Sequence, residues 1–370
     1  MKKKKFLFIL NTYNFQSKIL NKKKNIEQNY NYFNSQDFVW TNYFFNNLKE
    51  DYLTYKDYPN LNKKLLKKGD YLKYLKNKID KIKPDLILST TNDYKIDSLL
   101  NKVNNTKKII WASYKIDINK LKKLKKSYDY ILSSNKRVLF IAKKIHFKSF
   151  EMLISSPTFY RLNKKNFKSR KNDIIFIGSL GSNFSNRLNL LLNINKNFKI
   201  DLRIRNLVEK YFLMNSFNFY LKKIFPKFTE ILYKKKILPI TNNLKYSNKN
   251  EVFGSRMFDE LRRFRFCLNP HSDFDQNKNI NARVYEALAS GCLLFSDKNI
   301  TMQKIFKQNK HVIYYNSSSD LEKKINFYKE NFEQAYKIAK QGNNYLISHH
   351  TSNKRLKVFK KIIKIILKKK

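Results

Sequence analysis

Residues 266–297 decide the fold, and they read FCLNPHSDFDQNKNINARVYEALASGCLLFSD. An apolar run ends at Pro270, a polar loop follows, and residues 281–290 then have the apolar spacing of a helix. Gly291 is a natural stop for that helix, and a second apolar run begins directly after it, at 292–296. A strand, a helix and a strand in this order predict two parallel strands joined by a right-handed crossover.

The same alternation continues on both sides of this stretch. Short apolar runs bounded by polar residues predict strands at 6–10, 84–89, 108–112, 128–133, 173–177, 200–204 and 311–315. Between them lie segments with helical spacing, at 63–83, 118–126, 185–195 and 254–264, with further helices from Ser319 onward. The sequence therefore predicts an α/β protein with two Rossmann-like, doubly wound units, each built on a mostly parallel sheet.

The length of the chain also favours two units. It has 370 residues, 42% hydrophobic and 15% aromatic, so that each half can bury a core of its own. Residues 161–172 are polar and basic, which indicates a linker. We therefore expect one domain at 1–165, a second at 166–346, and a basic amphipathic C-terminal helix at 347–370. That helix can pack back on the domains, or it can lie on an anionic membrane surface.

The chain is strongly basic. It has 78 Lys and Arg against 28 Asp and Glu, a formal net charge of +50, yet only twelve of the basic residues are Arg. Abundant Lys, Asn, Ile, Phe and Tyr with scarce Gly, Ala, Arg and Pro are typical of an AT-biased genome, so the charge by itself is weak evidence for a function. It still favours anionic partners and surfaces.

Two cysteines, Cys267 and Cys292, exclude a disulfide framework. After the basic start, the apolar run at 6–10 is shorter than the core of about 7–15 residues that a signal peptide needs. No segment approaches the roughly 18–20 apolar residues that span a bilayer. We expect a cytoplasmic protein that can touch the inner face of the membrane.

The arginines gather in one part of the chain. Eight of the twelve fall between Arg187 and Arg283, and a retained Arg in a Lys-biased chain indicates a need for planar, bidentate donors. The first turn of the helix at 281–290 carries Arg283 and Glu286. Strand ends beside a helix N-terminus hold anionic ligands in α/β folds, so Arg283 can meet a diphosphate and Glu286 can accept hydrogen bonds from ribose hydroxyls. The alternative is an ion pair on a solvated helix face.

Four segments in order resemble the CgeB-like, group-1-type glycosyltransferases of the GT-B fold. They are Phe176–Ser179 followed by Arg187; Val252–Phe258 leading into Leu268–His271; Asn281–Gly291 followed by Phe295–Asp297; and Ile338–Gly342 followed by His349–Thr351 and Arg355. Together they cover about residues 173–356. The N-terminal half resembles the family mainly in the rhythm of its strands and helices.

The resemblance implies two Rossmann-like domains facing a cleft. The C-terminal domain would bind a nucleotide-diphospho-sugar, and the N-terminal domain a glycan, lipid-linked or protein acceptor, in cell-surface polysaccharide biosynthesis. Glu286 matches the second Glu of the family's E-x7-E pattern, the ribose ligand. Lys278 stands where the first Glu would be, so the donor-sugar contact must come from elsewhere in the loop, such as Asp275 or a backbone amide. Whether the transfer retains or inverts the stereochemistry of the sugar therefore stays open.

The expected chemistry follows from the charge that develops on the leaving diphosphate. Arg187, Arg283 and the backbone amides after Gly178 are placed to stabilise it, without a metal or a resident cofactor. The candidate donor-binding residues are Gly178, Ser179, Arg187, Asn269, His271, Asp275, Arg283 and Glu286. His271 can contact the phosphates or make a structural hydrogen bond. For an inverting reaction, Asp93 and Asp117, each after a predicted strand, are candidate catalytic bases, or else surface residues in turns.

Other ligands fit single features less well. Asp273-Phe-Asp275 has the spacing of a divalent-metal site, but we expect no metal here. Residues 178–181, Gly-Ser-Leu-Gly, lack the third glycine of a dinucleotide fingerprint and the Lys-Ser/Thr of a P-loop, which argues against NAD and ATP. The adjacent His349 and His350 lack a third zinc ligand.

Two further function classes stay as alternatives. A basic, aromatic-rich chain suits nucleic acid, but the lysines are spread along its whole length and no recognition motif is present. A GT-B fold can also serve a nucleotide-sugar epimerase or hydrolase. Steep, sequence-indifferent salt dependence would favour the first alternative, and products without a glycosylated acceptor the second.

Overall fold

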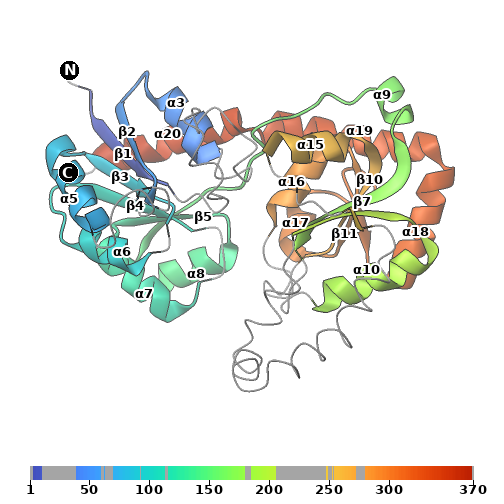
Figure 1. Ribbon diagram of the computed structural model, residues 1–370, viewed down its shortest axis with the longest axis horizontal. Helices are drawn as coiled ribbons and strands as arrows, with labels where there is room; N and C mark the ends of the chain where they lie inside the picture. The colour runs from blue at the N-terminus through green and yellow to red at the C-terminus, as the bar shows by residue number, and fades with distance from the viewer. Residues whose placement is uncertain are drawn as a thin grey trace. The chain divides into compact units, whose positions relative to one another are not determined.

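The computed structural model describes residues 3–10, 39–59, 62, 70–91, 93–112, 116–179, 185–205, 247–248, 252, 254–271 and 280–368. The chain divides into two compact units. The N-terminal unit comprises Met1–Thr158, Phe253–Ser255 and His349–Lys370, and the C-terminal unit comprises Phe159–Val252 and Arg256–Ser348. Figure 1 shows a sheet with helices on both faces in each of them, which confirms the predicted α/β class.

The N-terminal unit has a six-stranded sheet in the order β2-β1-β3-β4-β5-β6, and every pair in it is parallel. Its strands are β1 (Lys5–Ile9), β2 (Leu53–Asp57), β3 (Leu86–Ser89), β4 (Lys107–Trp111), β5 (Tyr130–Ser133) and β6 (Lys148–Glu151). Its helices are η3 (Val39–Phe44), α3 (Phe45–Leu48), α5 (Asp70–Ile82), α6 (Tyr94–Asn101), α7 (Ile118–Ser127), α8 (Lys136–Lys144) and α20 (Ser352–Lys368).

Side chains alternate between the two faces of this sheet, and each face has its own core. Leu7 and Ile9 of β1 pack with apolar residues of α5, α6, α7 and α8. Phe6 and Phe8 face the other way and pack with η3, α3 and α20. The sheet is therefore buried on both faces, as parallel sheets are.

Helix α20 returns to the N-terminal unit from the far end of the chain. Its apolar stripe is buried in the core of that unit, and the ring of Phe359 stacks on Phe44 with 5.4 Å between centroids. Lys360 pairs with Asp51 at 2.7 Å. The stripe that we expected either on the domains or on a membrane packs inside the protein, and Lys354, Lys357, Lys361, Lys364 and Lys368 lie on the exposed side.

The C-terminal unit has a second six-stranded parallel sheet, in the order β12-β11-β10-β7-β8-β9. Its strands are β7 (Lys171–Ser179), β8 (Ile200–Arg205), β9 (Ser247–Asn248), β10 (Phe264–Asn269), β11 (Leu293–Asp297) and β12 (Ile313–Tyr315). Its helices are α9 (Lys164–Lys168), α10 (Ser185–Asn197), α15 (Gly254–Arg262, which begins within the N-terminal unit), α16 (Ala282–Ala289), α17 (Ile300–Ile305), α18 (Ser318–Glu330) and α19 (Phe332–His349).

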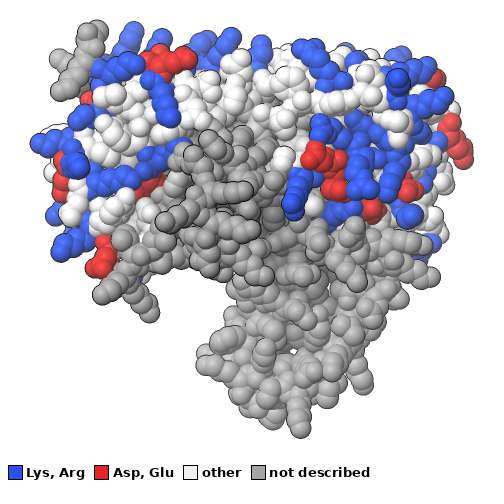
Figure 2. Space-filling view, turned by 45° about the horizontal axis from the view of Figure 1, so that its top comes forward, with Lys and Arg blue, Asp and Glu red and all other residues white. Residues whose placement is uncertain are grey.

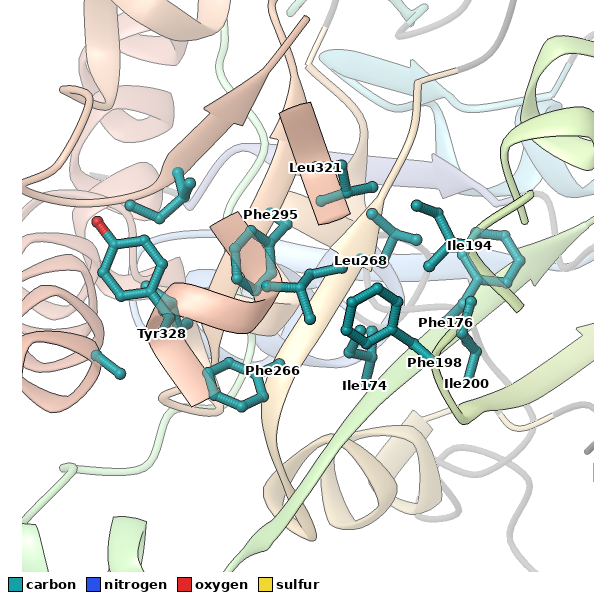
Figure 3. Close-up of a cluster of buried hydrophobic side chains, with 14 of the residues drawn as sticks. Ile174, Phe176, Ile194, Phe198, Ile200, Phe266, Leu268, Phe295, Leu321 and Tyr328 are labelled. Carbon is teal, nitrogen blue, oxygen red and sulfur yellow. The ribbon is translucent and has the colours of Figure 1, made fainter. Parts of the chain in front are cut away.

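Aromatic side chains from neighbouring strands fill the core of the C-terminal unit (Figure 3). Phe266 of β10 and Phe295 of β11 lie with their ring centroids 5.9 Å apart, and Tyr328 of α18 packs against Phe295. Phe176 of β7 belongs to the same cluster. This packing aligns the carboxyl ends of β7, β10 and β11.

Gly291 ends α16 as the sequence indicated. It follows the C-cap residue Ser290 and has a φ of +74°, a left-handed conformation that glycine adopts without strain. A side chain at this position would also crowd Leu162, because its Cβ would lie 3.0 Å from the Cδ1 atom of that leucine.

The segment 161–172, expected as a linker, is part of the C-terminal unit. Leu162 and Phe167 are completely buried in its core, and α9 and the start of β7 lie within it. The boundary between the units falls earlier, between Thr158 and Phe159. The interpretation as a linker was wrong because two apolar side chains among many Lys and Asn residues are enough to anchor the segment.

Candidate functional site

The polar residues that end three adjacent strands meet at the carboxyl edge of the C-terminal sheet. β7 ends in Gly178–Ser179, β10 runs into Asn269–His271, and β11 ends in Ser296–Asp297. Because the order is β11-β10-β7 and all pairs are parallel, these ends lie side by side. This is the edge where open α/β sheets bind ligands.

Helix α16 begins at this edge and is fixed to β10. The side chain of Asn281 caps the helix by accepting from the backbone N–H of Val284, and its Nδ2 donates to Oδ1 of Asn269 at 3.0 Å. The Ser296 hydroxyl donates to the carbonyl of Asn269, also at 3.0 Å. These bonds set the position of the first turn of α16 relative to the strand ends.

The first turn of α16 holds a buried ion pair. Arg283 Nη1 lies 2.8 Å from Glu286 Oε2, and the two side chains are 16% and 6% exposed. Arg283 Nε donates to the carbonyl of Ile177 in β7 at 3.1 Å. Because both side chains are largely buried, the alternative of an ion pair on a solvated helix face is excluded. Burying either charge without the other would be costly.

Arg187 comes from α10 and holds the chain that follows β10. Its Nε and Nη2 both donate to the carbonyl of Pro270, at 3.1 and 2.8 Å. The guanidinium is buried and lies 5.8 Å from the ring centroid of Phe176. This fork fixes the backbone immediately before His271.

Asp297 orients His271. The backbone N–H of His271 donates to Asp297 Oδ1 at 3.0 Å, and the ring Nδ1 lies 2.6 Å from the same oxygen. Ring Nε2 is buried, and it has no hydrogen-bond partner among the residues that the structure describes. The same holds for Nδ2 of Asn269. His271 Nε2 and Asn269 Nδ2 thus remain for a ligand, within the described part of the chain.

The structure brings together Gly178, Arg187, Asn269, His271, Arg283 and Glu286 in one place. Ser179 ends β7 beside Gly178. Asp275 and the Asp273–Asp275 pair lie outside the described residues, as does Lys278. Asp297, which sequence reasoning gave no role, belongs to the site. The available signal was its position in the sequence. Asp297 directly follows one apolar run, as His271 follows another.

Asp93 and Asp117 lie in the N-terminal unit, and each caps a helix. Asp93 Oδ1 accepts from the backbone N–H of Lys95 at 2.9 Å, and Asp117 Oδ1 accepts from that of Lys120 at 2.8 Å. The backbone hydrogen bond from Lys120 lowers the pKa of Asp117. Such a carboxylate is a weaker base than an ordinary one.

Within the described ranges, no three His, Cys, Asp or Glu side chains are grouped as a metal site requires. In the same part of the chain, no helix has the length and apolar character needed to cross a membrane.

Solved structures with a similar fold were found for the whole chain. Sucrose-phosphate synthase from Thermosynechococcus elongatus matches with a TM-score of 0.66 at 10% identity, over 98% of this chain and 99% of that one. HepE from Anabaena, in complex with UDP-glucose, matches with a TM-score of 0.62 at 8% identity, over 97% and 99%. A glycosyltransferase from Rickettsia africae matches with a TM-score of 0.57 at 15% identity, over 100% of both chains.

The chain has the GT-B fold. Residues 227–361 match the family described as Glycosyl transferase-like, a segment that contains Asn269, Arg283 and Glu286. No curated protein matches the chain by sequence. The predicted GT-B fold is thus confirmed, and the site lies in the sheet of the C-terminal GT-B unit.

Proposed function

We propose that this GT-B protein is a glycosyltransferase that moves a sugar from a nucleotide-diphospho-sugar to a glycan, lipid-linked or protein acceptor. The observation that carries the proposal is the buried pair of Arg283 and Glu286 at the carboxyl edge of the C-terminal sheet. It lies within the segment that matches the glycosyl transferase-like family. HepE, a structural neighbour, was solved with UDP-glucose bound.

The proposal gives roles to Glu286, Arg283, His271 and the end of β7. Glu286 accepts hydrogen bonds from the ribose hydroxyls, and its carboxylate is held in position for this by Arg283. Arg283 donates to the diphosphate, together with the backbone amides at the end of β7. His271 Nε2, without a partner among the described residues, donates to a phosphate oxygen when the ring is protonated.

Leaving-group stabilisation supplies the rate enhancement. As the sugar–oxygen bond breaks, negative charge grows on the diphosphate, and fixed donors stabilise it more than they stabilise the ground state. This proposal needs neither metal nor cofactor. Asp93 and Asp117 remain candidates for the base of an inverting reaction, although each already accepts a backbone hydrogen bond.

The cellular setting is part of the proposal. A cytoplasmic, CgeB-like enzyme of cell-surface polysaccharide biosynthesis would work on acceptors made at the inner face of the membrane. The exposed lysines of α20 favour an anionic lipid surface by charge alone, since the apolar stripe of that helix is buried. Co-sedimentation with anionic but not neutral vesicles, lost at high salt, tests this contact.

The first test is thermal unfolding with UDP, GDP, dTDP, CMP, ATP, NAD and a short RNA. A ligand of the native state raises the unfolding midpoint. We expect one nucleoside diphosphate to raise it, and the rise to disappear in Glu286→Ala and Glu286→Gln, the second of which keeps the shape of the side chain. Glu330→Ala removes an exposed Glu from the same unit and serves as the matched control.

The other outcomes separate the alternatives. An unchanged shift in folded Glu286→Gln would refute the role of Glu286. Equal shifts with every polyanion would show only the attraction of a basic chain, and a shift with RNA alone would favour nucleic-acid binding. Release of free or epimerised sugar, with no glycosylated acceptor, would favour the hydrolase or epimerase.

A further inference from the structure

A pocket of about 420 Å³ lies in the C-terminal unit, away from the site described above. Lys171, the first residue of β7, is in its wall, and so is Arg263, which immediately precedes β10. The pocket is therefore at the amino edge of the sheet. The nine residues of β7 separate it from Gly178–Ser179 by roughly 25 Å, at about 3.3 Å per residue.

Cationic groups dominate the wall of this pocket. It is lined by Tyr160, Asn166, Arg170, Lys171, Arg262 and Arg263, with no acidic side chain among its lining residues. Lys and Arg outnumber Asp and Glu over the described part of the face in Figure 2, so a basic surface alone marks no site in this protein. The pocket differs from the rest of this surface in the burial of one of its arginines and in how few acidic partners its cations have.

Arg170 is buried without a counter-ion. The residue is 7% exposed, and Nη1 donates to two carbonyls, of Gly291 at 3.1 Å and of Phe264 at 3.5 Å. No carboxylate pairs with it in the described part of the chain. Burial lowers its pKa, and the nearby charge of Arg262 lowers it further. An anion in the pocket would compensate both effects.

Two guanidiniums lie close to the ring of Tyr160 in the wall of the pocket. The centre of the Arg170 guanidinium is 5.8 Å from the centroid of its ring, and that of Arg262 is 5.6 Å away. The tyrosine is itself fixed, since its N–H donates to the carbonyl of Ala289 at 2.8 Å and its hydroxyl accepts from Asn166. Two like charges are thus held at one rigid ring.

The acids near the pocket neutralise only part of its charge. Arg262 pairs with Asp259, and Arg263 pairs with Glu260 at 2.9 Å. Glu260 is shared with Arg203, at 2.7 Å. Arg170 and Lys171 have no acidic partner among the described residues, so two positive charges remain for a ligand.

We propose that this pocket binds the phosphate or diphosphate group of a small ligand, as an anion site separate from the donor site. Planar guanidiniums beside an ammonium are the donors that phosphate oxygens prefer. The volume is in the range of small-molecule sites and exceeds what a lone phosphate fills. A phosphorylated sugar or a free diphosphate shares the chemistry that the wall recognises.

The test is calorimetric titration of the full chain with inorganic diphosphate at moderate salt. Lys171→Gln/Arg262→Gln removes two exposed cations of the wall and leaves Arg170 in place, so that folding is preserved. Lys310→Gln/Lys337→Gln removes the same charge from exposed positions elsewhere in the unit. We expect diphosphate affinity to fall about tenfold or more in the first variant and to stay unchanged in the second.

A donor-site variant separates this proposal from the proposed function. Arg283→Gln should keep diphosphate binding at the pocket, whatever it does to nucleotide binding. Titration with glucose 6-phosphate and with inorganic diphosphate then distinguishes a sugar phosphate from the bare anion as the preferred ligand. Equal affinity in wild type and Lys171→Gln/Arg262→Gln would overturn the proposal, and so would an equal loss in Lys310→Gln/Lys337→Gln.

Discussion

Arg283 and Glu286 stand three residues apart on α16 and pair across 2.8 Å, with Glu286 only 6% exposed. Pairs with this spacing are common on solvated helix faces, where they contribute little to stability. Here the pair is enclosed by the ends of β7 and β10, and Arg283 also reaches the carbonyl of Ile177. The helix thus presents a fixed carboxylate and a fixed guanidinium at the carboxyl edge of the sheet.

The geometry of Arg283 leads to a first prediction. Arg283→Lys keeps the charge, but one ammonium cannot match a planar guanidinium that meets Glu286 and Ile177 together. We expect the fold to persist and nucleoside diphosphate affinity to fall about tenfold, as measured by calorimetry. Arg137→Lys, at an exposed position of the other unit, should leave the affinity unchanged. Equal affinities in the two variants would contradict the role of Arg283.

A second prediction concerns Gly342 in α19. A Cβ at this position would lie 2.4 Å from the carbonyl oxygen of His311, a backbone atom that cannot swing aside. Gly342→Ala should therefore lower the free energy of unfolding by about 1–3 kcal/mol, even though alanine normally stabilises a helix interior. Chemical unfolding measures this. Asn344→Ala, on the exposed side of the same helix, should be neutral or stabilising, and a stabilised Gly342→Ala would refute the close approach.

The third prediction is a pH dependence at Asp97. Burial raises the pKa of this carboxyl, although it accepts a hydrogen bond from the Tyr128 hydroxyl at 2.7 Å. The charged form is thus disfavoured in the folded state, so the charge costs stability at neutral pH. That cost disappears as the pH falls through the folded pKa towards the ordinary value of about 3.9.

Asp97→Asn keeps an oxygen for Tyr128 and removes the charge. We expect a higher unfolding midpoint than wild type at about pH 7, and a smaller difference at about pH 4. Asp80→Asn, at an exposed position of α5, is the control and should show neither effect. A gain for Asp97→Asn that is the same at both pH values would rule out the burial of charge as its cause.

The cysteines give a fourth prediction. Cys267 and Cys292 are completely buried, and burial raises the pKa of Cys292 to about 11 and that of Cys267 well above its ordinary value. Because the thiolate is the reactive form, the native protein should not react with a thiol reagent such as DTNB at mildly alkaline pH. Denaturation should release both thiols together. Rapid labelling of the native chain would show that one of the two cysteines becomes accessible without global unfolding.

The central strands and the edge strand β12 could be predicted from the sequence, but the edge strands β2, β6 and β9 could not. Strands buried on both faces are continuous apolar runs, such as Leu86–Ser89 and Leu293–Asp297. β6 at the edge, Lys148–Glu151, has two exposed charged ends and no apolar run, and β2 at the opposite edge, Leu53–Asp57, is only partly buried. Such segments become strands through pairing with a neighbour, which local sequence does not encode.

The site was predictable to the extent that its residues follow strands. Arg283, Glu286, Asn269 and His271 were recognised from their place after apolar runs and at a helix start. The partner of His271 was missed because Asp297 comes 26 residues later, and only the pairing of β10 with β11 makes them neighbours. The pocket at Arg170 was missed for a similar reason, since its wall is assembled from residues 160–171 and 262–263.

The return of α20 has a consequence for how the protein is made. Strand β1 is synthesised before the C-terminal unit, and it carries Phe6, whose face of the sheet is covered in part by Phe359 and the rest of that helix. The part of this apolar face that α20 covers stays open until Ser352–Lys368 have been synthesised, after the entire C-terminal unit. The N-terminal unit therefore completes its core only after the C-terminal unit has been made, and until then its exposed apolar surface favours aggregation.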